Sequence, residues 1–326
     1  MKKTLIPLAF IIVQSAFGQV YKKSEPLAHT FSIVARDSVT GDMGVAVQSH
    51  WFSVGTSVIH GEAGVGVVAT QSFINPSYGP KGLALMAQGL SPQQALKALL
   101  ENDKGEAVRQ VAMLNVNGEN AVHTGSMCIG AAGHRQGKNF SVQANLMLNN
   151  TVWDAMATAF ETTKGTLAER IMAALNAAQN EKGDMRGQQS AAILIVKAKS
   201  TGDSWRDVIM DLRVDDSKQP LVELERLMQV HKAYEFMNKG DLAMEEGDST
   251  EAEHFYLEAQ KLFPENLEMK FWYAVNLLNN KEFKKAKPIL RSIFKQDKNW
   301  QLLIPRLVKS KLLLLSDTVL EKIMHL

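Results

Sequence analysis

The chain has 326 residues, of which 45% are hydrophobic, and its formal net charge is +2. A chain of this length and apolar content can bury a large core and is long enough to form two domains. The near-neutral charge argues against nucleic acid as a partner, because proteins that bind nucleic acid usually display a strongly basic face.

The first 18 residues have the pattern of a secretory signal peptide. Two lysines precede an apolar run from Leu5 to Val13, and small residues follow at the positions that determine cleavage. We therefore expect cleavage near Gly18/Gln19, which leaves residues 19–29 as a short linker. No apolar run reaches the roughly 20 residues needed to cross a bilayer, so the mature chain is predicted to be secreted or periplasmic, without a membrane span.

Short strand patterns alternate with helical patterns from Thr30 to about residue 214. The hairpin signals are a Gly- and Asp-containing turn after Arg36 and the dipeptide Asn117-Gly118. Strands are expected over Thr30–Arg36, Met43–Gln48, Val65–Phe73, Arg109–Val116, Ala121–Thr124, Phe140–Leu146, Ser190–Ala198 and Val208–Val214.

Helices are expected on both sides of Leu90 and over Val152–Thr162 and Leu167–Gln179. Ser91, followed by Pro92 and by Gln94, has the arrangement of a capping box at a helix start. The segment Asn75–Pro80 contains two prolines and a glycine and is predicted to be a loop. Hairpins that alternate with paired helices indicate an α+β fold with antiparallel sheets and helices on their outer faces.

The residues from 221 to 326 differ in composition, being charged, aromatic and helix-forming. Gly240, Ala252, Tyr256, Ala259 and Pro264 have the spacing of a tetratricopeptide repeat, and most positions 34 residues further on are also small or apolar. We expect stacked helix pairs in this tail. The tail either docks on the first domain or binds a peptide from a protein partner in its concave groove.

The first domain contains seven further motifs: Thr30–Asp37, Gly44–Phe52, Ala69–Ser72, Tyr78–Pro80, His123–Gly125, Val142–Asn145 and Gly183–Ser190. Together they resemble the family called domain of unknown function 1028, which is grouped with the N-terminal nucleophile (Ntn) hydrolases. The resemblance covers roughly residues 29–232, with the motifs in the same order. It implies a four-layer αββα sandwich over residues 30–220 and a nucleophile at the start of the first strand, Thr30.

A terminal threonine can act as a nucleophile because its own α-amino group removes the hydroxyl proton. That amine has an ordinary pKa of about 7.7 to 8.0, so a useful fraction is neutral near pH 7. In this chain residues 19–29 still precede Thr30 after loss of the leader, and the mechanism requires their removal. The alternative is that Thr30 is an ordinary β-branched strand residue.

Three polar residues, Gln48, Ser49 and His50, end the second predicted strand beside the start of the first, where they are candidates for a wall of the site. His50 is either a general base with a pKa near 6.5 or a hydrogen-bonded loop histidine. Asp184 and Arg186 either clamp a carboxylate or amide of the substrate, or pair with each other across a loop.

Neutral polar side chains supply further candidates for the pocket or for holding an oxyanion: Gln71, Asn75, Tyr78 and Asn145. Cys128 is the only cysteine, so no intramolecular disulfide forms. The histidines show no ligand spacing for zinc, and neither a metal nor a cofactor is predicted.

Two functions are consistent with these patterns. The first is hydrolysis of an amide bond in a small or peptide-like substrate by Thr30. The second is a non-catalytic binding module with the same fold, whose helical repeats recruit a protein partner. The sequence leaves the substrate and the formation of a homo-oligomer open.

Overall fold

A computed structural model describes residues 27–326. The predicted leader and residues 19–26 lie outside this range. The chain divides into two compact units, one ending at Pro220 and the other beginning at Leu221. In the described part of the chain, no helix combines the length and the apolar character needed to cross a membrane.

The first unit contains a six-stranded antiparallel sheet in the order β11-β10-β3-β2-β9-β8. The predicted hairpin forms its centre, with Thr30 opposite Ser49 and Arg36 opposite Met43. Strands β2 and β3 are buried over nearly their whole length. The strands are β2 (Thr30–Arg36), β3 (Met43–Ser49), β8 (Gly133–Gly137), β9 (Phe140–Ala144), β10 (Ser190–Val196) and β11 (Val208–Val214).

A second antiparallel sheet is built around β5, which pairs with β6 along one edge and with β4 and β1 along the other. The Asn117-Gly118 turn joins β6 to β7 as predicted, and Gly118 has the positive φ of 83° that such turns require. The strands are β1 (Leu27–Ala28), β4 (Ile59–Glu62), β5 (Gly66–Phe73), β6 (Arg109–Asn115) and β7 (Asn120–Thr124).

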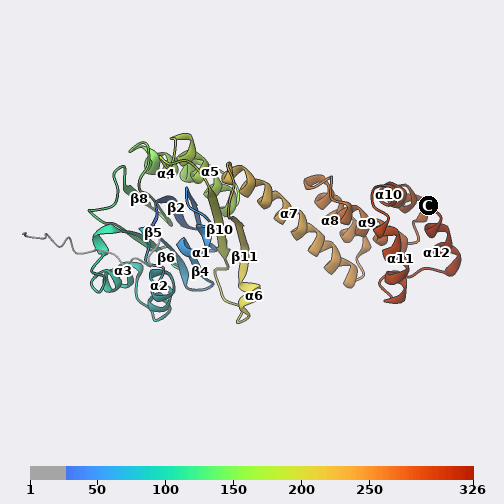
Figure 1. Ribbon diagram of the computed structural model, residues 1–326. Coiled ribbons are helices and arrows are strands. Elements are labelled where there is room, and N and C mark those ends of the chain that lie inside the picture. The colour runs from blue at the N-terminus through green and yellow to red at the C-terminus, as the bar shows by residue number, and fades with distance from the viewer. Residues whose placement is uncertain (1–26) are drawn as a thin grey trace, which may run out of the picture. The chain divides into compact units, whose positions relative to one another are not determined.

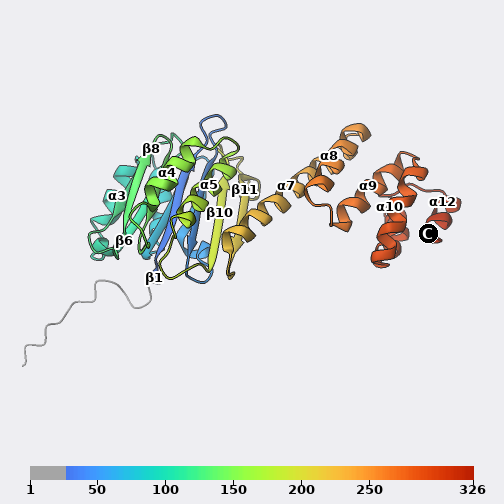
Figure 2. The same ribbon diagram turned by 90° about the horizontal axis from the view of Figure 1, so that it is seen from above.

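The two sheets pack face to face, and two pairs of helices contact them on their other sides (Figures 1 and 2). Helices α4 (Val152–Thr162) and α5 (Leu167–Asn180) contact the six-stranded sheet, whereas α2 (Tyr78–Ala87) and α3 (Pro92–Leu100) contact the other. The capping box at Ser91 begins α3 as predicted. The mixed α/β organisation predicted for this unit is confirmed.

The space between the sheets is apolar over most of its extent. Val34, Val45 and Val47 of the six-stranded sheet pack against Val67 and Ala69 of the other within one buried cluster. Every second residue of a strand faces the same side, so Ser32 and Thr30 continue the row of Val34 toward the end of the interface. The interior therefore changes from apolar to polar along β2.

Three parts of the predicted layout were wrong. Tyr78 begins α2, although we expected a loop through Pro80. Pro80 is compatible with the first turn of a helix, where the backbone N–H groups have no intrahelical acceptor. The strands β4 and β8 were not predicted, because their short sequences contain glycine and charged or polar residues. Leu27–Ala28, placed in a linker by the sequence, forms strand β1.

The second unit is entirely helical, and its core depends on small residues that allow close helix packing. Ala252, Tyr256 and Ala259 of α8 are buried with Met237 and Ala233 of α7. A side chain at Gly240 would meet the ring of Tyr256 at 2.6 Å. The helices are α7 (Pro220–Glu245), α8 (Ser249–Leu262), α9 (Leu267–Asn279), α10 (Phe283–Gln296), α11 (Asn299–Lys309) and α12 (Asp317–Met324).

This packing predicts the effect of a large side chain in the second unit. Ala252 is fully buried, so Ala252→Arg should overfill the contact with α7 and lower the free energy of unfolding by about 1 to 3 kcal/mol or more. His254 is exposed on the same helix, and His254→Arg should change it by less than about 0.5 kcal/mol. Urea unfolding monitored by circular dichroism measures both. Equal effects of the two substitutions would contradict the packing described here.

Candidate functional site

Side-chain amides from both sheets meet at the polar end of the inter-sheet space. Gln71 of β5 donates through Nε2 to Oε1 of its neighbour Gln110 at 2.6 Å and to the Thr30 carbonyl at 3.2 Å. Asn145, just after β9, donates through Nδ2 to the same Gln110 oxygen at 2.8 Å. These amides are fully buried, so they satisfy one another in place of water.

Ser32 and Gln143 extend this network along the six-stranded sheet. Ser32 Oγ donates to Gln71 Oε1 at 2.5 Å and accepts from Gln143 Nε2 at 2.6 Å. The residues that follow Gln71 and Asn145, Ser72 and Leu146, have positive φ angles of 73° and 57°. Such angles are uncommon outside glycine and concentrate at functional sites.

Thr30 lies at the centre of this polar end and is fully buried. Its Oγ1 donates a hydrogen bond to the Ala28 carbonyl at 2.7 Å. Its own carbonyl accepts from the backbone N–H of Asn145 at 3.1 Å as well as from Gln71. In this form of the chain the nitrogen of Thr30 belongs to a peptide bond, and it therefore has no basic lone pair.

The carbonyl oxygen of His29, in the peptide bond that precedes Thr30, accepts two side-chain hydrogen bonds. The Ser49 hydroxyl donates to it at 2.7 Å, and the Arg186 guanidinium donates through Nη2 at 2.8 Å. Two donors directed at one carbonyl, one of them charged, polarise that carbonyl and stabilise negative charge that develops on its oxygen.

Arg186 is held in this position by Asp184. The carboxylate accepts from Arg186 Nη2 at 2.6 Å and from Nε at 3.0 Å, and it is almost completely buried. The backbone N–H of His50 also donates to Asp184, at 3.2 Å. Asp184 and Arg186 thus pair, which was one of the two predicted alternatives, while the imidazole of His50 is directed toward the Gln188 carbonyl at 3.4 Å.

Ala28 and His29, which precede Thr30, are buried. Ala28 pairs with Ser72 in the edge of the five-stranded sheet, and the ring of His29 contacts Phe73 edge to face at 5.5 Å. His29 Nδ1 lies 2.9 Å from Asn145 Oδ1. Because an amide oxygen only accepts hydrogen bonds, Nδ1 is protonated in this contact.

Burial lowers the pKa of His29, and the positive charge of Arg186 acts in the same direction, whereas the hydrogen bond to Asn145 opposes the shift. His29 is therefore a neutral imidazole near pH 7 in the folded chain. Burial also lowers the pKa values of His60 and His134 elsewhere in this unit.

Three predicted site residues lie away from this cluster. Gln48 pairs with Phe31, so it faces the helix side of the six-stranded sheet, opposite to Thr30. Its amide is fully buried and forms no hydrogen bond with a described residue. Asn75 caps its own turn through Ser77, and Tyr78 donates to Asp103 at 3.1 Å.

The structure thus brings together Thr30, Ser49, Gln71, Asn145, Asp184 and Arg186. Sequence reasoning missed Ser32, Gln110 and Gln143, which lie inside predicted strands, and His29, which was assigned to a linker. A polar residue at an inward-facing position of a buried strand is the signal that identifies the first three. Within residues 27–326 no cluster of three metal-ligating side chains is found.

Comparison with known proteins places the site within a family. Residues 30–224 match the model of a family of unknown function (DUF1028), and residues 243–304 match a tetratricopeptide repeat. A crystal structure of a DUF1028 protein from Silicibacter pomeroyi is 30% identical, with a TM-score of 0.56 over 62% of this chain and 88% of that one. No curated protein matches the sequence.

The amide network predicts that two buried glutamines differ in their contribution to stability. Gln71→Met removes hydrogen bonds to Ser32, Gln110 and Thr30 and should lower the free energy of unfolding by about 1 to 3 kcal/mol. Gln48→Met removes an equally buried amide without partners and should be neutral or stabilising. Equilibrium urea unfolding of both variants provides the test. Equal losses in the free energy of unfolding would contradict the prediction.

The buried histidine predicts a pH dependence. Because the folded pKa of His29 lies below its unfolded value of 6.5, the unfolded chain takes up the proton first. The stabilisation that His29 contributes to the folded state is fully present above pH 6.5 and is lost as the pH falls toward the folded pKa. In urea unfolding at pH 7.5 and 5.5, the loss of stability should be smaller for His29→Gln than for the wild-type chain. The same loss in both would show that His29 is not the titrating group.

Proposed function

We propose that this chain, which belongs to the DUF1028 family of unknown function, is an amide hydrolase of the N-terminal nucleophile type. The site supports this proposal because it surrounds Thr30 with oriented hydrogen-bond donors. Two face-to-face antiparallel sheets with helices on their outer sides support an αββα sandwich of that type. The observation on which the proposal rests is the pair of donors, Ser49 and Arg186, on the His29 carbonyl.

In this proposal residues 27–29 occupy the substrate site. Removal of residues up to His29 exposes Thr30 as the new terminus and frees Ser49 Oγ, Arg186 Nη2 and Asn145 Oδ1. A substrate carbonyl then takes the place of the His29 carbonyl, and an amide N–H of the substrate takes the place of the imidazole N–H. Groups that recognise a carbonyl and an adjacent N–H suit a small or peptide-like amide.

The reaction proceeds through an ester on Thr30. The α-amino group removes the proton of Oγ1, and the oxygen attacks the substrate carbonyl carbon. Ser49 and Arg186 stabilise the oxyanion of the tetrahedral intermediate. The proton then passes to the leaving nitrogen as the C–N bond breaks and the amine departs. Water attacks the ester, releases the acid and restores the threonine.

Processing takes place in two steps in this scheme. The leader, residues 1–18, directs export to the periplasm or the exterior, and a second cleavage removes residues 19–29. The polarised His29 carbonyl is the carbonyl of the bond to be cut in that second step. Intact-mass analysis of the protein from its native compartment checks the scheme by the presence of a species that begins at Thr30.

One observation favours a second function, a binding module without catalysis. Residues 27 and 28 are not a loose extension but pair with β5, and Thr30 beside them is fully buried. If they remain in place, the hydroxyl stays bonded to the Ala28 carbonyl and no terminal amine forms. The tetratricopeptide repeat then supplies the function by binding a protein partner.

The hydrolase proposal predicts that activity requires both a free terminus and the Thr30 hydroxyl. The chain beginning at residue 30, produced by removal of an initiator methionine, should hydrolyse a panel of N-acyl amino-acid anilides that the chain beginning at residue 19 leaves intact. Thr30→Ala should abolish turnover at a stability cost below about 1 kcal/mol, whereas Thr30→Ser should retain part of it.

Ser49→Ala removes one oxyanion donor and should lower kcat by about 10²- to 10³-fold. Thr40→Ala, in an exposed turn, is the matched control and should leave turnover unchanged. Equal rates for the chains that begin at residues 19 and 30 would rule out the terminal amine as the base. If no variant turns over any substrate, the binding module is the better account.

A further inference from the structure

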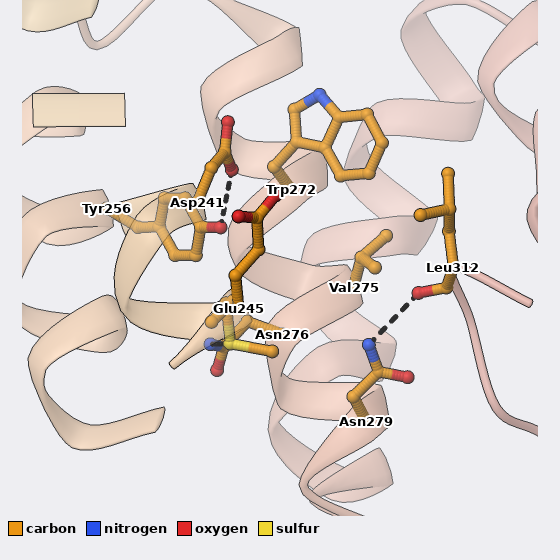
Figure 3. A pocket seen from close by; sticks show the side chains of 9 residues that line it. Asp241, Glu245, Tyr256, Trp272, Val275, Asn276, Asn279 and Leu312 are labelled. Atoms are coloured by element: carbon orange, nitrogen blue, oxygen red, sulfur yellow. Dashed lines mark hydrogen bonds between the residues drawn. The ribbon is translucent and has the colours of Figure 1, made fainter. Parts of the chain in front are cut away.

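The helical unit contains a pocket on the surface formed by α7, α8 and α9 (Figure 3). Its volume is about 300 Å³, which is large enough for one long side chain of a partner. The repeat spacing identified by the sequence accounts for the packing between these helices but assigns no ligand to the pocket. It is lined by Asp241, Met244, Glu245, Tyr256, Trp272, Val275, Asn276, Asn279 and Leu312.

The lining contains two carboxylates and no basic side chain. Asp241 and Glu245 are one helical turn apart, and neither forms an ion pair with a residue in the described part of the chain. Asp241 accepts a hydrogen bond from the Tyr256 hydroxyl at 2.7 Å. Burial raises the pKa of Asp241, and repulsion from Glu245 and Glu268 adds to this effect. A cation placed between the carboxylates would relieve that repulsion.

Part of the remaining lining is apolar. The indole of Trp272 lies beside the carboxylates (Figure 3). Val275, Leu312 and Met244 also line the pocket. A guanidinium group is planar and weakly hydrated, and it stacks on aromatic faces while its edge pairs with carboxylates. The compact, strongly hydrated ammonium of lysine matches this combination less well.

The pocket also contains a buried amide with a weak partner. Asn276 is only 2% exposed, and its Nδ2 contacts the sulfur of Met244 at 2.6 Å, although a thioether is a poor acceptor. The Asn276 Oδ1 accepts from Asn280 Nδ2 at 3.0 Å, and the neighbouring Asn279 donates to the Leu312 carbonyl at 3.2 Å and accepts from the Leu314 N–H at 3.0 Å. Because an amide nitrogen carries two N–H groups and the Met244 sulfur is the one acceptor found for it among the described residues, Asn276 has donor capacity for a carbonyl oxygen, such as that of a peptide.

We propose that this pocket binds an arginine side chain in an extended peptide segment of a partner protein. The guanidinium lies against Trp272 and pairs with Asp241 and Glu245, while Asn276 donates to a carbonyl of the peptide backbone. This function is independent of Thr30 and is compatible with either function proposed for the first unit.

The test uses the full chain beginning at residue 19 and two labelled peptide libraries. Both are eight residues long with Ala, Ser and Leu at the varied positions; one has arginine at position 4 and the other citrulline, its uncharged analogue. Fluorescence anisotropy should show binding of the arginine library at least about tenfold tighter, and this preference should weaken at 0.5 M NaCl because salt screens the charge pairing.

The double variant Asp241→Asn, Glu245→Gln keeps the shape of the pocket and should abolish the preference for arginine. Glu246→Gln, an exposed neighbour outside the pocket, is the matched control and should retain it. Thermal unfolding verifies that both variants are folded. Equal binding of the two libraries, binding of neither, or an undiminished preference in the double variant would each overturn the proposal. A self-association that the double variant abolishes would identify a second copy as the occupant and would also overturn it.

Discussion

Hydrogen bonding among amides buried between two sheets is the constraint on which the first unit depends. Gln71, Gln110 and Asn145 have no access to water, so each must find its partners in the opposite sheet or in a neighbouring strand. A shift of either sheet by one residue would turn these side chains to the other face and leave several donors and acceptors unpaired. The network therefore selects one register of β2 against β9 and of β5 against β6, and that arrangement places Thr30 among the amides.

The same network makes the polar end of the interior better suited to recognising a carbonyl group than to stabilising the fold. Apolar residues such as Val47 and Ala69 fill the rest of the inter-sheet space, and an apolar end would avoid the desolvation of so many amides. Oriented amides and a held guanidinium, in contrast, recognise a carbonyl without reorganising. The Arg186 guanidinium and the Ser49 hydroxyl hold the carbonyl of His29, a residue of the chain itself. The amides of Gln71 and Asn145 hold the carbonyl of Thr30. Loss of residues up to His29 would remove the occupant and leave its binding groups in position.

Local signals in the sequence predicted those elements that local interactions determine. The Asn117-Gly118 turn and the Ser91 capping box each depend on a few adjacent residues, and both are present as expected. The assembly of the site could not be read in this way, because Gln110 and Gln143 are ordinary strand positions until pairing brings them opposite Gln71 and Ser32. Gln48 illustrates the same limit: it adjoins Ser49 in sequence, yet alternation along β3 places it on the other face.

The two units use buried polar groups in opposite ways. In the first unit the amides around Thr30 satisfy one another, and the donors Ser49 and Arg186 are paired with the His29 carbonyl. In the second unit the core consists of small and apolar residues, and the polar groups gather at a pocket whose two carboxylates lack a counter-charge in the described chain. A satisfied site must lose a segment before it can accept a ligand, whereas a site with uncompensated charge gains stability directly from a cation. Under the proposed hydrolase function the first unit depends on processing, whereas under the proposed arginine-binding function the second unit binds its partner both before and after that processing.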